Sequence, residues 1–181
     1  LELLRAARAS SNLVSTGYEA SAAVDAQGQL VAWGTIGRYG EVASDCFHSL
    51  SPTLMATPSS IRVARVAAGH YHVLALTHTG AVLSFGVGEY GQLGHGDRGD
   101  QREPKVIEKL RGVRAVTIAA GEGHSIVLTD EGAVLSFGSG AFGQLGHGDQ
   151  EAQLKPKVIK ALRRRRVVAI AASSYHSIVL T

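Results

Sequence analysis

The sequence of 181 residues holds one cysteine, four prolines and one tryptophan, and aromatic residues make up only 6% of it. The single cysteine, Cys46, allows no intrachain disulfide, which favours an intracellular compartment: we expect the cytoplasm, with nucleus and cytoskeleton left open. No apolar run approaches the roughly 20 residues that span a bilayer, and the N-terminus shows no signal-peptide pattern. The few aromatics argue against nucleic-acid binding, although the net charge of +3 is mildly basic.

Glycine is abundant instead, with 22 residues, and it recurs at a constant spacing. Residues 66–117 align with residues 118–169 without a gap, and more than half of the aligned positions are identical. The repeated framework consists of Gly69, His72, Gly80, Gly86, Gly91 and Gly94, then Gly121, His124, Gly132, Gly138, Gly143 and Gly146, and finally His176. Identity at this level indicates a duplicated structural unit.

The spacing divides the whole chain. We expect an N-terminal segment (1–13), a degenerate repeat (14–65), two regular repeats (66–117 and 118–169) and the truncated start of another (170–181). In the degenerate repeat Ala20 replaces the histidine, and the poor match of residues 41–60 predicts an altered outer strand or loop. In the N-terminal segment, Leu1–Ala9 has the spacing of a short helix that would need a packing partner.

Within each regular repeat the local signals are those of β-strands. Val73–Leu76 and Ala81–Phe85 flank a glycine turn, and further strands are expected at Pro104–Ile107 and Val113–Ala119. Four short strands in about 50 residues are typical of a propeller blade. The sequence therefore predicts an all-β fold, a partial β-propeller of about three and a half four-stranded antiparallel blades. Glycines between the strands would allow positive φ and close backbone approach near the axis. Other sequence or another chain would supply the remainder of the ring.

Two patterns resemble ligand sites. Residues 86–91 and 138–143 both fit G-x-G-x-x-G after a strand, but a dinucleotide site needs a following helix, and the residues that follow are too glycine-rich to form one. The pairs His95/Asp97 and His147/Asp149 could suggest metal ligands, yet the copies would lie on different blades. We interpret both patterns as structural turns and predict no cofactor or metal.

The recurring histidines are His72, His124 and His176, and serine follows the last two. Neighbouring residues of a strand point to opposite faces, so His124 and Ser125 cannot form a catalytic dyad. We expect a buried imidazole bonded to a neighbouring strand in each blade, and we predict no catalytic residue.

One continuous motif connects these features with a known family. It comprises Gly121, His124, Ser125, Leu128 and Thr129, then Gly132, Val134, Ser136, Phe137 and Gly138, then Gly143 through Asp149. This motif closely resembles the regulator of chromosome condensation repeat, over residues 66–181 well and over 14–40 loosely. The resemblance implies a seven-bladed propeller of which this chain supplies about half.

Functions in this family are diverse. The resemblance implies either a non-catalytic protein-interaction scaffold, guanine-nucleotide exchange on a small GTPase, or recruitment of substrate in a larger ubiquitin ligase or kinase. Exchange would require an inserted loop, for which only residues 41–60 are a candidate. The single tryptophan, Trp33, argues against the light-sensing role of one relative.

We expect a scaffold with protein partners of unknown identity, because the repeats differ mainly in their loops. The loop residues expected to contact partners are Arg98, Asp100, Arg102, Gln150 and Glu151, together with Arg164 and Arg165. The last two belong to the run 163–166, which is either a solvated loop or a docking site for an acidic protein, nucleic acid or phospholipid headgroup.

Overall fold

The computed structural model describes residues 13–37, 47–58 and 60–181, and within them the fold is all-β. The first sheet has the order β1 (Val14–Thr16), β2 (Ala20–Val24), β3 (Leu30–Ile36), β4 (Phe47–Leu54). The second has β5 (Val63–Ala68), β6 (His72–Thr77), β7 (Val82–Gly86) and β8 (Gln101–Val106). The third has β9 (Ala115–Ala120), β10 (His124–Thr129), β11 (Val134–Gly138) and β12 (Gln153–Val158). A final hairpin pairs β13 (Ala169–Ala172) with β14 (Ser177–Leu180).

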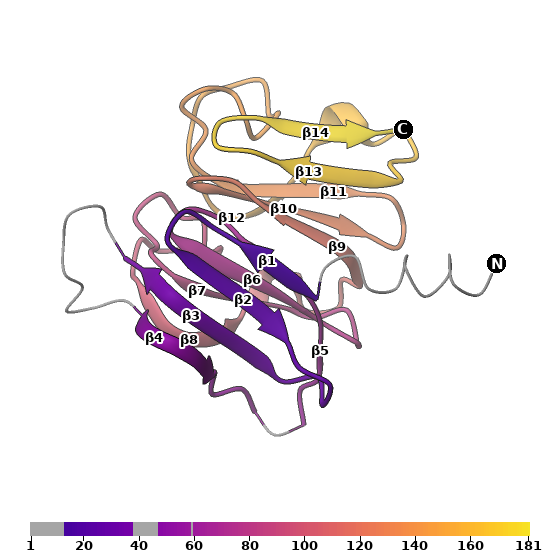
Figure 1. Cartoon of the computed structure of the whole chain (residues 1–181). Helices are drawn as coiled ribbons and strands as arrows, with labels where there is room; N and C mark the ends of the chain where they lie inside the picture. The colour runs from indigo at the N-terminus through magenta and orange to yellow at the C-terminus, as the bar shows by residue number, and fades with distance from the viewer. Residues whose placement is uncertain (1–12, 38–46, 59) are drawn as a thin grey trace.

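The sheets are antiparallel meanders that stack face to face around a common axis (Figure 1). The first strands of successive sheets, β1, β5, β9 and β13, contact one another in turn and therefore line the axis. Three four-stranded sheets and one hairpin confirm the expected partial propeller of about three and a half blades.

The inner strands of the second and third sheets are buried on both sides, because each is covered by a neighbouring sheet. Along β6, Val73 and Ala75 pack into the core shared with the first sheet, whereas Leu74 and Leu76 pack into the core shared with the third. Phe85 and Phe137 fill equivalent positions in these two cores and are fully buried. Each such side chain contributes roughly 1.5–3 kcal/mol, which a single isolated sheet could not gain on both faces.

The sheets do not begin and end at the same residues as the sequence repeats. The strand expected at Val113–Ala119 is present as β9, but it pairs with β10 and so opens the next sheet. The 3-10 helices η1 (Glu108–Leu110) and η2 (Lys160–Leu162) connect one sheet to the next.

The outer strand of the first sheet is altered, as expected from the poor match there. β4 is eight residues long, whereas β8 and β12 each have six, and most of its residues are exposed. The helix expected at 1–9 and the first part of the candidate exchange loop, 41–46, lie outside the described residues. Within the described ranges, no helix is long and apolar enough to cross a membrane.

The two ends of the strands form two different faces. On the first, the turns that join each innermost strand to the next surround the axis, and the long loops 87–100 and 139–152 lie beyond them; we call this the loop face. On the second, the turns after β2, β6 and β10 meet the connections 107–114 and 159–168; we call this the hairpin face. Any partner that docks on the ends of the blades meets one of these two faces.

Candidate binding faces

The loop face is closed tightly at the axis by glycine. A Cβ on Gly17 would strike the carbonyl oxygen of Gly69, a Cβ on Gly69 that of Gly121, and a Cβ on Gly121 that of Ser173. Backbone bonds from His70 N to Gly121 O (3.3 Å) and from Glu122 N to Ser174 O (3.2 Å) hold the same turns together. Around this contact lies a hollow of about 330 Å³ lined by the axial turns.

The framework glycines therefore serve two purposes. Gly69 and Gly121 have no positive φ and are needed for the close approach at the axis. A positive φ is found at Gly80, Gly86, Gly91 and Gly94 and at their counterparts Gly132, Gly138, Gly143 and Gly146. Both of the expected reasons for glycine are observed, and they coincide at Gly86 and Gly138, where a Cβ would also strike a backbone carbonyl oxygen.

The histidines of the framework connect neighbouring sheets. His72 Nε2 lies 2.8 Å from Ser125 Oγ, on the next sheet, and both residues are buried. The Ser125 hydroxyl donates to the carbonyl oxygen of Gln92 at 2.8 Å, so its oxygen must accept the Nε2–H of His72. The imidazole is thus a neutral donor, and its Nδ1, which has no hydrogen-bond partner, is the unprotonated nitrogen.

The next interface repeats the arrangement. His124 Nε2 contacts Ser177 Oγ at 3.0 Å, and Ser177 donates to the carbonyl oxygen of Gln144. Burial in the interface lowers the pKa of His72 from 6.5 to about 3 and that of His124 to about 4, which keeps both rings neutral. The expected buried imidazole is confirmed for these two, whereas His176 is exposed because no further strand covers it within the described residues.

The first interface lacks both members of the pair. Ala20 occupies the histidine position and Val73 the serine position, and both are buried. Replacing both partners by apolar groups leaves no orphaned donor, whereas replacing one would leave a buried N–H without a partner. The histidine of one blade and the serine of the next are therefore either both present or both replaced by apolar residues at these interfaces.

This pairing predicts the effect of removing the serine alone. Ser125→Val should destabilise the protein by about 2 kcal/mol, because the buried Nε2–H of His72 loses its acceptor. Urea unfolding of the variant measures the change. Ser51→Val, at an exposed position of β4, should stay within about 0.5 kcal/mol of the wild type; equal effects of the two substitutions would contradict the inter-blade pairing.

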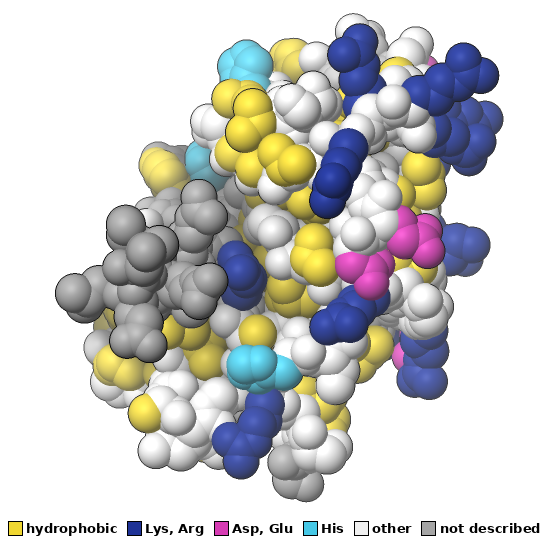
Figure 2. Space-filling model, turned by 90° about the vertical axis from the view of Figure 1, so that its right-hand side faces the viewer, with side chains coloured by type: hydrophobic (Ala, Val, Ile, Leu, Met, Phe, Trp, Pro, Cys, Tyr) yellow, Lys and Arg dark blue, Asp and Glu magenta, His cyan; other side chains and the backbone are white. Residues whose placement is uncertain are grey.

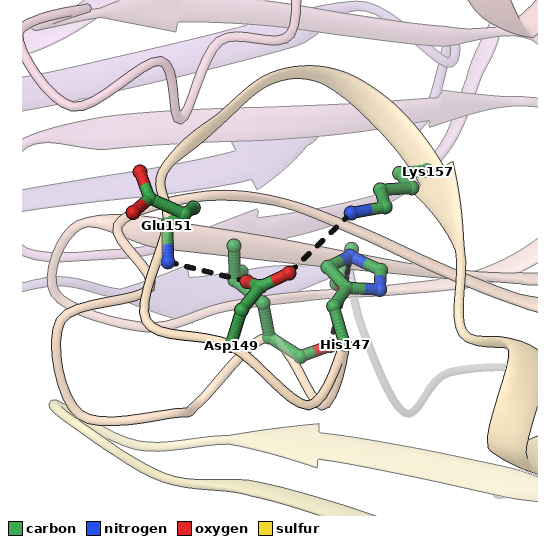
Figure 3. Close-up of polar contacts among 6 residues, drawn as sticks. His147, Asp149, Glu151 and Lys157 are labelled. Carbon is green, nitrogen blue, oxygen red and sulfur yellow. Dashed lines mark hydrogen bonds and ion pairs between the residues drawn. The ribbon is translucent and has the colours of Figure 1, made fainter.

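The histidine–aspartate pairs are structural in both regular blades. His147 Nε2 lies 3.0 Å from Ser136 Oγ. Asp149 Oδ1 accepts the backbone N–H of Glu151 (Figure 3). The second oxygen of Asp149 lies 3.8 Å from Lys157 Nζ. His95 contacts Ser84 in the same way, at 3.1 Å. Burial lowers the pKa of both His95 and His147, and the described residues contain no cluster of three potential metal ligands.

The two G-x-G-x-x-G segments form tight turns. Gly91 N donates to Gly88 O at 2.7 Å, and Tyr90 N donates to the side chain of Gln92. The segment at 138–143 repeats both bonds, and no helix follows either of them among the described residues. Within the described residues, neither turn leads directly into the helix N-terminus at which a dinucleotide fold binds pyrophosphate.

The residues expected to contact partners separate onto the two faces. Arg98, Asp100, Gln150 and Glu151 belong to the loop face, Arg102 is the second residue of the adjoining strand β8, and Arg164 and Arg165 lie on the hairpin face. Some of them hold their own loop: Asp100 Oδ1 accepts Gly88 N at 2.8 Å, and Arg98 donates to Glu89 O. Gln150, Glu151, Arg164 and Arg165 are exposed. Because these residues lie on two different faces, a partner that docks on one face cannot contact all of them.

Sequence reasoning missed a group of side chains around the axis on the loop face, which we call the axial cluster. His70 stacks on Tyr18 with ring centroids 5.1 Å apart and meets Tyr71 edge-on at 5.8 Å. Glu122 accepts the Tyr175 hydroxyl at 3.0 Å, and its other oxygen lies 3.5 Å from His70 Nδ1. The cluster comprises Tyr18, His70, Tyr71, Tyr90, Glu122 and Tyr175.

Tyr90 joins this cluster from the long loop 87–100. Its ring lies over Gly123, where a Cβ would come within 2.9 Å of it. Partial burial, and then the negative charge of Glu122, raise the pKa of Tyr71; the hydrogen bond to Glu122 raises that of Tyr175. A signal was present in the sequence: the residues between the framework glycine and histidine change from blade to blade. Because aromatic residues are few in the whole sequence, the convergence of these tyrosines at the axis was not apparent from it.

The two faces also carry opposite charge. The described loops of the loop face hold seven acidic side chains and one basic one, Arg98. The described turns and connections of the hairpin face hold nine basic and four acidic side chains. Figure 2 views the second face, on which the Lys and Arg side chains clearly outnumber Asp and Glu. On this face Arg62, Arg114 and Arg166 recur once per blade, each near the glycine of a preceding turn.

The described residues form a partial propeller of stacked blades, joined by inter-blade histidines, that presents two faces. Its sequence matches the family model of the regulator of chromosome condensation (RCC1) repeat over residues 79–128 and 131–180. A second model of the same repeat matches residues 63–92 and 115–144. The chain belongs to the RCC1 repeat family.

Known relatives are much longer than this chain. The human E3 ubiquitin-protein ligase HERC2 is 43% identical over 156 residues, which are 84% of this chain and 3% of the relative. The ultraviolet-B receptor UVR8 of Arabidopsis thaliana is 32% identical over 170 residues, 93% of this chain and 38% of the receptor. The crystal structure of Prp20p from Saccharomyces cerevisiae superposes with a TM-score of 0.79 at 21% identity, covering 92% of this chain and 42% of Prp20p.

Proposed function

We propose that the chain is part of a non-catalytic protein-interaction scaffold inside the cell, in which the stacked blades hold variable loops for binding partner proteins. The observation that carries this proposal is the pair of oppositely charged faces on one repeated framework. The buried groups with the most strongly lowered pKa values, His72 and His124, are hydrogen-bonded to serines of the next blade. Rigid blades with exposed, dissimilar loops are suited to recognition.

Crosslinking from defined positions tests the proposal in the full-length protein. A photoreactive amino acid at Gln150 reports on the loop face, and one at Arg164 reports on the hairpin face. We expect each to capture specific proteins, with different partners on the two faces because their charges differ. The control is Glu103, an exposed residue on the outer strand β8; the same captured proteins at all three positions, or none at any, would contradict a scaffold role.

A second candidate role is recruitment of substrate within a larger ubiquitin ligase. The 43% identity with HERC2 over 156 residues favours it, although those residues make up only 3% of that ligase. If this role is correct, proteins captured from Gln150 or Arg164 should be ubiquitylated by the full-length protein, and variants that lose capture should lose ubiquitylation. If the captured proteins were never ubiquitylated, the scaffold proposal would stand and the ligase role would be contradicted.

A further inference from the structure

The axial cluster has a composition that favours a cationic ligand. Tyr18, Tyr90 and Tyr175 expose 55%, 39% and 43% of their surface at the mouth of the axis, where Glu122 also lies. Exposed tyrosine rings attract a cation through their π-electrons, and a carboxylate beside them adds direct charge attraction. Four of the five tyrosines of the chain are gathered here.

Glu122 is held in place before any ligand arrives. Its two carboxylate oxygens contact the Tyr175 hydroxyl and His70 Nδ1, and its side chain is 23% exposed. A fixed, partly exposed carboxylate costs little further ordering when a cation binds.

The surroundings extend the negative charge over the whole face. Glu19 follows Tyr18 in the first axial turn, Glu89 precedes Tyr90, and Glu151 lies in the long loop of the third sheet. The described loops of this face hold seven acidic side chains and one basic side chain, so the face would attract a basic partner and repel an acidic one. A segment that carries several basic residues therefore fits this face better than a single small cation.

We propose that the axial cluster is the docking site for an arginine- or lysine-rich segment of a partner protein, with one basic side chain placed over the tyrosine rings beside Glu122. The inference rests on the scaffold function and specifies the chemistry of one of its partners. The hollow of about 330 Å³ at the same place, lined by residues such as Thr16, His70 and Ser174, gives that side chain room.

The test uses the full-length protein and a short fluorescein-labelled peptide in which arginine alternates with glycine. Fluorescence anisotropy should show binding that weakens as sodium chloride is added. A matched peptide with glutamate in place of arginine should not bind. Failure of the arginine peptide to bind, or equal binding of the glutamate peptide, would overturn the inference.

Variants identify the site. Glu122→Gln removes the charge while keeping an acceptor for Tyr175, and it should weaken binding of the arginine peptide about tenfold. Tyr18→Leu should weaken it about threefold, whereas Tyr18→Phe, which keeps the ring, should bind as the wild type does. Glu131→Gln is the matched control: it removes one charge from the exposed turn after β10, on the hairpin face, and should change binding by less than about twofold.

The outcomes separate this inference from the function on which it rests. Equal binding by the wild type, Glu122→Gln and Tyr18→Leu, with unchanged thermal unfolding, would overturn the axial site. If crosslinking from Gln150 or Arg164 still captured partners from those same variants, the scaffold proposal would stand alone. If no partner were captured from any face, the scaffold proposal itself would fall.

Discussion

Gly121→Ala should lower the free energy of unfolding by about 3 kcal/mol, because the added methyl group has no space at the axis. A Cβ there would overlap the ring of His124 and the carbonyl oxygen of Ser173. The backbone cannot retreat easily, since Gly121 N donates to His124 O at 2.9 Å and Gly121 O accepts the N–H of His70. Urea unfolding followed by circular dichroism measures the loss.

Gly99→Ala is the control for the same chemical change on the same face. A Cβ at Gly99 would have no neighbour closer than 3.4 Å, and the equivalent residue of the next repeat is Glu151, so a side chain is tolerated there. Its expected effect is within about 0.5 kcal/mol. A loss at Gly121 no larger than the loss at Gly99 would show that the axial turns are not closely packed.

The repeat made most of the fold predictable. A period of 52 residues located every inner hairpin, because the glycine turn after Thr77 and the one after Thr129 occupy the same position. The assignment of β9 to the next sheet was not predictable in this way. A repeating sequence fixes the order of strands but not the point at which one sheet ends, which depends on the pairing of β9 with β10.

The candidate sites were predicted less completely, for a physical reason. The buried histidines were expected, yet their partners are 53 residues away, on the next sheet. The axial cluster depends on the same stacking, which brings Tyr18, Glu122 and Tyr175 together from three different turns. Local spacing reports which face of a strand a residue occupies, but convergence across blades appears only when the sheets are stacked around an axis.

Acidification should destabilise the protein through the two inter-blade histidines. In the unfolded chain each imidazole takes up a proton below pH 6.5, whereas the folded pKa values of His72 and His124 are about 3 and about 4. The unfolded state therefore binds more protons in this window, so the stability that is complete above pH 6.5 is lost as the pH falls toward the folded values. We expect a loss of about 2 kcal/mol for each histidine by pH 5, measured by urea unfolding at several pH values.

A double variant separates this effect from the titration of carboxylates. His72→Ala with Ser125→Val reproduces the apolar pair Ala20 and Val73 of the first interface. It removes one titrating imidazole, so the dependence of stability on pH between 6.5 and 5 should decrease by about 1 kcal/mol per pH unit, whatever stability the smaller side chain costs at pH 7. An unchanged slope would mean that His72 is not held neutral in the folded protein. A slope reduced as expected would mean that His72, buried as a neutral imidazole between the second and third blades, supplies its own share of the acid sensitivity and leaves the rest to His124 and the carboxylates.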